Sequence, residues 1–287
     1  MDQTIIDLYD DYVHRHFDRR LFLDRLAQHA GGLGAAMAIL PLLQSNYALA
    51  ATVAEDDARI KTSRVTFPGA TGPLKAYLAA PAGGGRHGGV LVVHQNRGLN
   101  PHIEDIARRL AVAGYVALAV DFLSPLGGTP ADENAAMQMF GRLDPARTTA
   151  DAVAAASYIR TLPDVNGKVG AVGFCWGGGV VNQLAVADPS LAAAAVYYGT
   201  PPSPGQAAKV HARMLLNYAD PNLDKRNGNL APGWASALKA EGKLDGFYFY
   251  TGAQHAFNDD TQSARYDKAA ADLAWSRTLA LFNKTLA

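Results

Sequence analysis

The sequence predicts an α/β fold in which helices cover both faces of a mostly parallel sheet, with an additional N-terminal helical extension. From residue 62 onward, short apolar runs typical of buried strands alternate with longer segments of helical periodicity. The chain has 287 residues, of which 49% are hydrophobic and 18% are charged, so it can bury a large core. We expect an N-terminal extension over residues 1–60 and one α/β domain over residues 61–287.

The expected elements follow in chain order. Two strands at residues 64–68 and 74–80 form an antiparallel pair, because Gly72-Pro73 between them favours a turn. Apolar runs predict further strands at residues 89–94, 115–120, 168–173, 192–198, 214–218 and 246–250. Helices are predicted at residues 103–113, 145–162, 178–187 and 265–286.

The N-terminal extension resembles a twin-arginine export signal. Arg19-Arg20 precede an apolar run at residues 31–43 and the site Ala48-Leu49-Ala50. This run is about half the length that a membrane-spanning helix needs, so no stable membrane insertion is expected. The pattern predicts a periplasmic or secreted protein whose mature chain starts near residue 51.

The alternative for this extension is a retained helical cap on a cytoplasmic protein. Acidic residues, Asp18 and Asp24, flank the paired arginines, and seventeen residues precede Asp18, which departs from the export pattern. In this alternative, two helices within residues 5–45 bury four side chains against the α/β domain, namely Leu21, Phe22, Leu26 and Met37.

Composition disfavours several classes of partner. Lys plus Arg and Asp plus Glu are equal at 26 each, and no basic stripe is present, so nucleic-acid binding is not expected. The chain has a single cysteine and no His-Glu-X-X-His pattern, so we expect no intramolecular disulfide, no metal and no cofactor. A small molecule is the expected partner, and the oligomeric state is not specified by the sequence.

The segment Gly173-Phe174-Cys175-Trp176-Gly177-Gly178 joins a predicted strand to a predicted helix. This context is typical of a nucleophile elbow, in which glycines allow a sharp reversal and hold the nucleophile at the end of the sheet. The partial positive charge of the following helix N-terminus would favour a thiolate at Cys175. The alternative for a lone cysteine is a small buried apolar residue.

Candidate partners for this nucleophile follow later strands, in the order nucleophile, acid, histidine. Asp220 comes after the strand at residues 214–218, and His255 comes after the strand at residues 246–250. We therefore predict that Asp220 orients His255 and that His255 activates Cys175. Asp224 is the local competitor of Asp220, whose alternative role is to start a turn before proline.

The loop that begins at His94 follows the first long core strand and predicts an oxyanion hole. The two expected donors are the backbone N–H groups of Trp176 and Asn96. Arg97 in the same loop is either a substrate anchor or a structural residue that pairs with a nearby carboxylate, such as Glu104 or Asp105.

The motifs G-F-C-W-G-G, H-Q-N-R-G-L-N-P-H and Q-H-A-F resemble those of the dienelactone hydrolase (carboxymethylenebutenolidase) family over roughly residues 62–287. The N-terminal R-R-x-F-L and N-Y-A-L-A segments resemble one branch of that family. The resemblance implies an α/β-hydrolase fold and a Cys-His-Asp triad on Cys175, His255 and Asp220. It also implies hydrolysis of a carboxylic ester or lactone.

Two departures from the family pattern concern the substrate. Gln95 occupies the position of the glutamate that, in the family, is thought to take the proton of the cysteine, and an amide cannot act as a base. An arginine that pairs with the substrate carboxylate is replaced within Asn258-Asp259-Asp260. The departures therefore leave the family fold and triad as expectations but do not support dienelactone as the substrate. Gln95 and Arg97, in the loop that begins at His94, are the candidate substrate-binding residues. Two alternatives remain open, a general carboxylesterase for neutral esters and a catalytically silent binding protein.

Overall fold

The computed structural model describes residues 1–15, 17–47 and 51–287, and it confirms the α/β fold. Within these residues, one sheet has the strand order β1-β2-β4-β3-β5-β6-β7-β8. β1 and β2 pair antiparallel, as do β2 and β4, and every later pairing is parallel. The strands are β1 (Ile60–Pro68), β2 (Pro73–Pro81), β3 (His87–Val93), β4 (Val116–Asp121), β5 (Val165–Phe174), β6 (Ala193–Tyr197), β7 (Arg213–Ala219) and β8 (Leu244–Tyr250).

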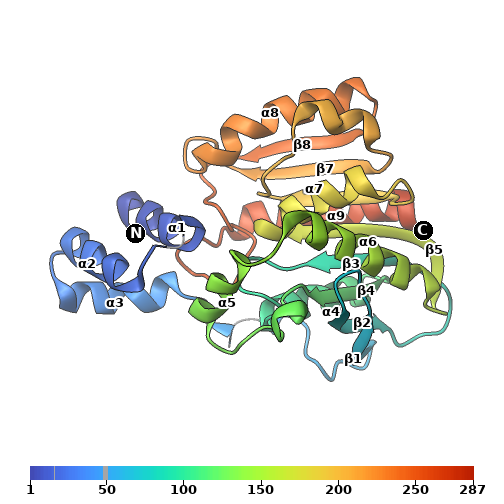
Figure 1. The fold of residues 1–287 in the computed structure, drawn as a ribbon, viewed down its shortest axis with the longest axis horizontal. Coiled ribbons are helices and arrows are strands. Elements are labelled where there is room, and N and C mark those ends of the chain that lie inside the picture. Colours follow the sequence, from blue (N-terminus) through green and yellow to red (C-terminus); the bar gives the residue numbers. More distant parts are fainter. Residues whose placement is uncertain (16, 48–50) are drawn as a thin grey trace.

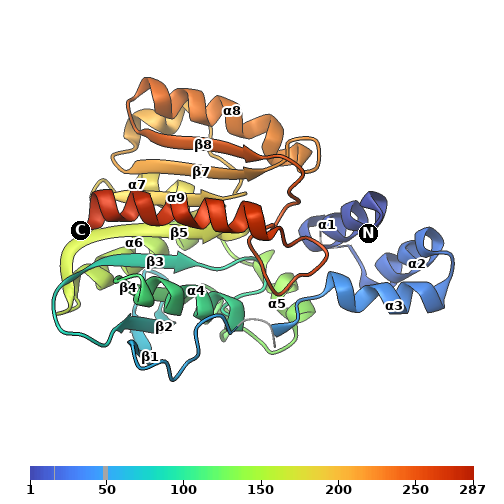
Figure 2. The ribbon, with the colours of Figure 1, turned by 180° about the vertical axis from the view of Figure 1, so that it is seen from behind.

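Helices cover both faces of this sheet (Figures 1 and 2). One face packs against α4 (Pro101–Val112) and α9 (Lys268–Leu286), and the opposite face packs against α6 (Pro145–Thr161), α7 (Trp176–Ala187) and α8 (Lys225–Ala240). Because both faces are covered, the central strands are continuous apolar runs, and Val90 to Val93 of β3 are 0% exposed. The shorter helices are η2 (Ser124–Leu126), α5 (Glu133–Phe140) and η3 (Pro204–Lys209).

All the strands and helices predicted for the α/β domain are present, with ends shifted by a few residues. Two helices, α5 and α8, were not predicted. α8 contains Gly228, Pro232 and Gly233, which break the usual helical sequence pattern, and its N-terminus is capped by Asp224. The cap and tertiary packing offset these unfavourable residues, since Trp234 of α8 is fully buried.

The N-terminal extension forms three helices, α1 (Gln3–Arg15), α2 (Arg19–Ala30) and α3 (Leu33–Leu43), rather than two. They project from one end of the α/β domain and have their own core (Figure 1). Phe22 and Leu26 are buried, but mainly in this core and not against the α/β domain as expected, whereas Leu21 is 41% exposed and Met37 is 53% exposed. The expectation for these two residues was wrong, because the helices bury one stripe mainly against each other.

No single helix in the described part of the chain is long and apolar enough to cross a membrane. Only α2 and α3 taken together are long and apolar enough, and the chain bends by 111° at the break between them. The predicted cleavage site Ala48-Leu49-Ala50 lies outside the described residues.

Candidate active site

Cys175 lies on a strained turn between the end of β5 and the start of α7. Its backbone has φ 54° and ψ −116°, a conformation that a non-glycine residue adopts rarely. The flanking glycines are required by close contacts. A Cβ on Gly173 would lie 2.2 Å from the Gly177 carbonyl oxygen, and one on Gly177 would lie 2.4 Å from the carbonyl oxygens of Val93 and His94. The backbone geometry is therefore that of the predicted nucleophile elbow.

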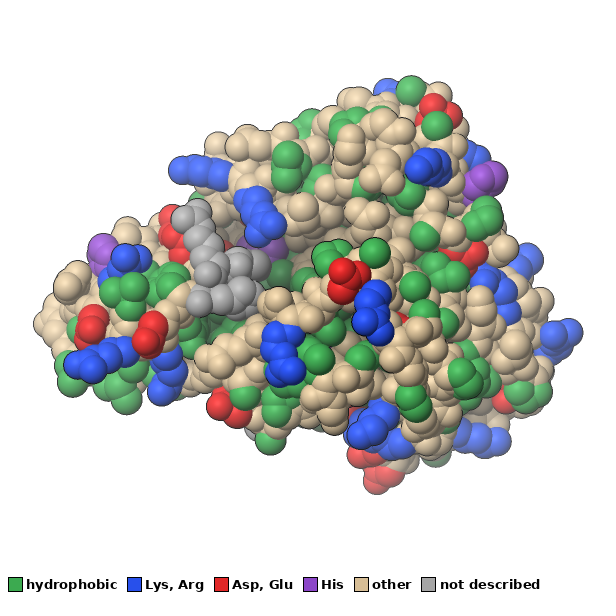
Figure 3. Space-filling view, viewed as in Figure 1, with side chains coloured by type: hydrophobic (Ala, Val, Ile, Leu, Met, Phe, Trp, Pro, Cys, Tyr) green, Lys and Arg blue, Asp and Glu red, His purple; other side chains and the backbone are tan. Residues whose placement is uncertain are grey.

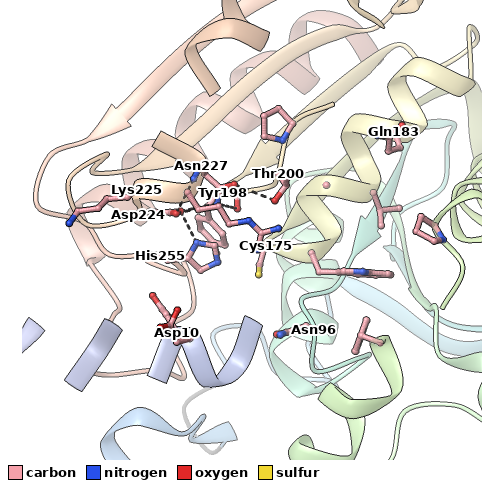
Figure 4. A pocket seen from close by; sticks show the side chains of 18 of the residues that line it. Asp10, Asn96, Cys175, Gln183, Tyr198, Thr200, Asp224, Lys225, Asn227 and His255 are labelled. Carbon is pink, nitrogen blue, oxygen red and sulfur yellow. Dashed lines mark hydrogen bonds and ion pairs between the residues drawn. The ribbon is translucent and has the colours of Figure 1, made fainter. Parts of the chain in front are cut away.

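His255 lies beside Cys175, and its ring is held by Asp224 (Figure 4). The Nδ1 of His255 is 2.8 Å from Oδ2 of Asp224, and both side chains are less than one tenth exposed. Asp224 also accepts hydrogen bonds from the backbone and side-chain nitrogens of Asn227. These contacts fix the imidazole so that its other nitrogen, Nε2, is on the side away from Asp224.

The prediction that Asp220 orients His255 is not met by the geometry. The carboxylate of Asp220 instead accepts from the backbone N–H of Gly252 at 2.8 Å and from Asn222 at 2.9 Å. It therefore ties together the loops that follow β7 and β8. Asp224 replaces it because the chain turns after Asp220 and begins α8, which brings the N-cap side chain of that helix to His255.

The charges at the site reinforce one another. Burial opposes a charged His255, but Cys175 and Asp224 raise the pKa of its imidazole well above the ordinary value. Burial likewise opposes an ionised Asp224, yet His255 and Asn227 hold the pKa of its carboxyl well below the ordinary value. The arrangement therefore favours a charged imidazolium at His255 beside the Asp224 carboxylate.

The two residues predicted to supply the oxyanion donors, Trp176 and Asn96, both line the cavity with Cys175. Trp176 is the first residue of α7, where a helix leaves the backbone N–H without a partner of its own. The indole of Trp176 stacks on His94 with ring centroids 5.4 Å apart. Asn96 lines the same cavity as Cys175, and its side-chain nitrogen donates to the Val13 carbonyl of α1 at 3.0 Å. Their backbone roles as oxyanion donors stay a prediction.

Gln95 and Arg97 are not among the residues that line the cavity, contrary to the expectation that they bind substrate. Gln95 donates to Asp259 at 3.1 Å. Arg97 is 2% exposed and contacts Glu133 at 3.2 Å and the Tyr9 hydroxyl at 2.9 Å. The structural alternative for Arg97 therefore holds, although its partner is neither Glu104 nor Asp105.

The cavity above Cys175 has a volume of about 790 Å³ and opens on the face shown in Figure 3. α1 supplies an acidic wall, which consists of Asp7, Asp10 and Asp11. The start of α8 supplies Lys225 and Arg226. Figure 4 shows Asp10 on α1, across from His255 and Cys175. The N-terminal extension is therefore part of the wall of the candidate active site.

One group of described residues, His102, Asp259 and Asp260, has metal-ligand atoms within 4.8 Å of one another. The group is already bonded within the protein. His102 Nδ1 is 3.0 Å from Asp260, Arg109 pairs with the same carboxylate, and His102 lowers the pKa of Asp259 against the effect of burial. We therefore describe it as an ion-pair cluster that links α4 to the loop after His255.

Comparison with known proteins finds matches to two family models and to several relatives. A family model described as "Dienelactone hydrolase family" matches residues 74–286, and one described as "YqhI-like" matches residues 1–32. A hydrolase fragment of Escherichia coli (strain K12) named YghX is 45% identical over 113 residues, which is 38% of this chain and 97% of the relative.

A Bradyrhizobium protein named as a probable 2-oxo-3-(5-oxofuran-2-ylidene)propanoate lactonase is 31% identical over 219 residues, or 71% of this chain and 86% of the relative. A crystal structure from Klebsiella pneumoniae, titled as a dienelactone hydrolase, covers 78% of this chain and 99% of its own with TM-score 0.69 and 26% identity. The match of the family model over most of the chain, together with these similarities, shows that the chain belongs to the dienelactone hydrolase family of α/β-hydrolases.

Proposed function

We propose that this protein hydrolyses a carboxylic ester or lactone with Cys175 as the nucleophile, His255 as the general acid and base, and Asp224 as the residue that orients His255. One observation carries the proposal. The cysteine of a strained elbow and a histidine held by a buried carboxylate line one cavity of substrate size.

The reaction follows from this geometry. The Cys175 thiolate attacks the carbonyl carbon, and the oxyanion that forms accepts hydrogen bonds from the N–H groups of Trp176 and Asn96. The imidazolium of His255 gives its proton to the leaving alkoxide as the carbon–oxygen bond breaks, which leaves a thioester. His255, now neutral, then removes a proton from water, and the resulting hydroxide attacks the thioester. The acid departs, and the thiolate and imidazolium return.

We propose that the preferred substrate has no carboxylate. The segment after His255 places Asp259 and Asp260 where the family pattern has a carboxylate-pairing arginine, and α1 adds an acidic wall. Asp259 and Asp260 are not among the lining residues, but the α1 carboxylates line the cavity itself, so an anionic substrate would meet those at close range. The described cations in the cavity lining are Lys225 and Arg226, at the start of α8 on the wall opposite α1. The Bradyrhizobium relative is named as a lactonase, which supports a lactone as well as an open-chain ester.

A second proposal is that the functional protein keeps its N-terminal extension, which cleavage of an export signal would remove. Export with cleavage near residue 51 would remove α1, α2 and α3, and with them one wall of the cavity. The contacts of Asn96 and Arg97 with α1 therefore favour a functional form that retains the extension, whichever compartment it occupies. Mass spectrometry of active protein purified from the native host tests this, since an active chain that starts near residue 51 would contradict it.

A chromogenic short-chain ester tests the proposed reaction. We expect the parent protein to hydrolyse it, and we expect Cys175→Ala to reduce the rate to that of a blank while the circular dichroism spectrum stays the same. Because the chain has one cysteine, a trapped acyl group found by mass spectrometry must be a thioester on Cys175 if hydroxylamine releases it at neutral pH. Parent activity that persists in Cys175→Ala would refute the mechanism. A parent protein that binds esters but never turns them over would favour the silent binding protein.

A pair of matched esters tests the substrate class. The same chromogenic leaving group is attached to a butyryl group and to a succinyl group, which differ chiefly in one carboxylate. We expect kcat/KM to be higher for the neutral ester. Equal or higher values for the carboxylate-bearing ester would contradict the proposed preference and would assign Lys225 and Arg226 as its partners.

A further inference from the structure

Tyr198 occupies a strained position directly beside Cys175. Phe174 of β5 pairs with Tyr197 of β6, so the next residue on each strand, Cys175 and Tyr198, are neighbours at the same edge of the sheet. The N–H of Cys175 donates to the Tyr197 carbonyl at 3.0 Å. Among the described non-glycine residues, positive φ occurs at Cys175, at Tyr198 with φ 40° and at Ala256 with φ 67°, next to His255. A strained backbone conformation persists where surrounding contacts enforce it, and strained residues are concentrated at functional sites.

The backbone of Tyr198 is fixed on both sides. Its N–H donates to the Asn217 carbonyl at 2.8 Å, and its carbonyl accepts from the side chain of Asn227 at 3.2 Å. Asn227 also bonds Asp224, the residue that holds His255. The position of the Tyr198 ring is therefore set by the same contacts that position the histidine.

The hydroxyl of Tyr198 is buried and has no hydrogen-bond partner among the described residues. The side chain is 1% exposed, so water does not supply the missing partner freely. Other buried tyrosines nearby are bonded. The hydroxyl of Tyr197 lies 2.8 Å from Thr278, and that of Tyr218 donates to the Gly199 carbonyl at 2.8 Å. A buried donor without a partner is destabilising and is uncommon in folded proteins.

Charged groups surround this hydroxyl. The ring lines the cavity with Cys175 and lies 5.0 Å, centroid to centroid, from the ring of His255. Burial raises the pKa of Tyr198 well above its ordinary value, the charges of Asp259 and Cys175 raise it further, and Arg265 opposes them. Because its pKa is raised, Tyr198 keeps its proton wherever an ordinary tyrosine does, and its hydroxyl can donate a hydrogen bond.

The titratable groups that face Cys175 and Tyr198 come from several elements. They are His255, Asp259 and Arg265 in the segment after β8, Asp224 before α8, Lys225 and Arg226 at the start of α8, and Asp7, Asp10 and Asp11 on α1. Each of them is present in both of the variants compared below, so a difference between those variants reports on the hydroxyl alone.

We propose that Tyr198 is a positioning residue for the nucleophile, and that its hydroxyl donates a hydrogen bond to the sulfur of Cys175 when the thiol ionises. A neutral thiol is a weak acceptor, whereas a thiolate is a strong one, so this bond forms mainly with the charged state. A hydrogen bond to the charged form lowers the pKa of an acid. Tyr198 thus takes part of the role that Gln95, an amide, cannot perform. The inference rests on the proposed function only in that Cys175 is the nucleophile.

The experiment compares Tyr198→Phe with Tyr197→Phe. Both variants remove one buried hydroxyl from adjacent residues, and only Tyr198 lines the cavity with Cys175. The rate of alkylation by iodoacetamide is measured from pH 4 to pH 10, and it reports on Cys175 alone because the chain has one cysteine. In Tyr198→Phe we expect the midpoint to rise by about one pH unit, a roughly tenfold smaller thiolate fraction on the acid side, with the same plateau at high pH.

Thermal unfolding and the activity profile complete the test. Tyr197→Phe should leave the alkylation midpoint unchanged and lower the melting temperature, because Thr278 loses its partner. Tyr198→Phe should not lower the melting temperature, because no existing bond is removed. Its kcat/KM for the chromogenic ester should fall at low pH and recover at high pH.

An unchanged alkylation midpoint in Tyr198→Phe would overturn the inference. Equal shifts of the midpoint in Tyr198→Phe and Tyr197→Phe would also overturn it, because they would indicate an effect of packing and not of the Tyr198 hydroxyl. The alkylation assay needs no substrate. If the parent hydrolyses no ester but the midpoint shifts, the proposed function fails and the inference stands.

Discussion

Asp224, rather than Asp220, should control the reactivity of His255, and a pair of conservative substitutions tests this. Asp224→Asn replaces a carboxylate oxygen that lies 2.8 Å from His255 Nδ1 with an amide of nearly the same shape. The amide keeps only one oxygen acceptor. If that oxygen faces His255, the amide nitrogen meets the backbone N–H of Asn227, and if it faces Asn227, the nitrogen meets His255. Asp220→Asn is the matched control, because it changes the same residue type in the same loop and leaves the His255 contact intact.

The expected magnitude follows from burial. The side chains of His255 and Asp224 are 7% and 8% exposed, so solvent screens their interaction little. Loss of the carboxylate in such a triad lowers turnover by roughly 10²- to 10⁴-fold, which is about 3–5 kcal/mol of transition-state stabilisation. Asp220→Asn keeps an oxygen that can accept from Gly252, so its kcat/KM should stay within about threefold of the parent.

The pH dependence of stability gives a second readout. The pKa of Asp224 is lowered by folding, so it contributes stability that is present above its unfolded value, about 3.9, and is lost as the pH falls through the folded value. The pKa of His255 is raised by folding, so its contribution is complete below about pH 6.5 and is lost as the pH rises through the folded value. Asp224→Asn should therefore lose most stability relative to the parent between about pH 4 and pH 6.5.

The assay measures kcat/KM for the chromogenic ester together with urea unfolding at pH 5 and pH 9. The reasoning is refuted if Asp220→Asn loses activity as severely as Asp224→Asn does. It is refuted equally if Asp224→Asn retains the activity of the parent, because the observed hydrogen bond would then have no part in the reaction.

Two further predictions concern the surroundings of the site. Gln95→Glu should destabilise the protein by about 2 kcal/mol, because the new carboxylate faces Asp259. Folding would raise the pKa of the new glutamate, so the destabilisation should be larger at pH 8 than at pH 5, as measured by urea unfolding at both pH values. Equal stability at both pH values would show that nearby cations neutralise the pair. Phe22→Ala should loosen the N-terminal extension, because Phe22 is 1% exposed and stacks on Tyr12 with centroids 4.5 Å apart. Removal of such a ring costs about 3–5 kcal/mol in a core. Limited proteolysis should then cut within residues 1–45 and esterase activity should fall, whereas Leu21→Ala, at a side chain 41% exposed, should change neither. Proteolysis of the extension without loss of activity would show that α1 is dispensable.

The sequence alone determined the order of the eight strands and of the helices α4, α6, α7 and α9 in the α/β domain. Buried parallel strands must be continuous apolar runs, and the run from Val90 to Val93 could be recognised without any tertiary information. The elbow around Cys175 was equally local, because the reversal of a strand into a helix requires glycines at fixed positions. His255 was found because it follows the last strand, as the order of the triad requires.

Only the tertiary structure decided which side chains meet. Asp220 and Asp224 both follow β7, and the choice between them depended on α8, a helix whose glycines and proline conceal it in the sequence. The contact of Gln95 with Asp259 joins residues 164 positions apart, and no local pattern encodes such a pairing. α1 lies against the cavity because of packing between distant segments, which the composition of residues 1–60 does not reveal.

The physical reason for this division is the range of the forces involved. Hydrophobic periodicity and steric limits on φ and ψ act between residues close in sequence, so they leave a readable pattern. Hydrogen bonds of single side chains depend on positions accurate to a few tenths of an ångström, which many packed elements set together. The unpartnered hydroxyl of Tyr198 illustrates the difference. Nothing in Val196-Tyr197-Tyr198-Gly199 distinguishes its two tyrosines, and the folded chain bonds one hydroxyl and places the other beside the nucleophile.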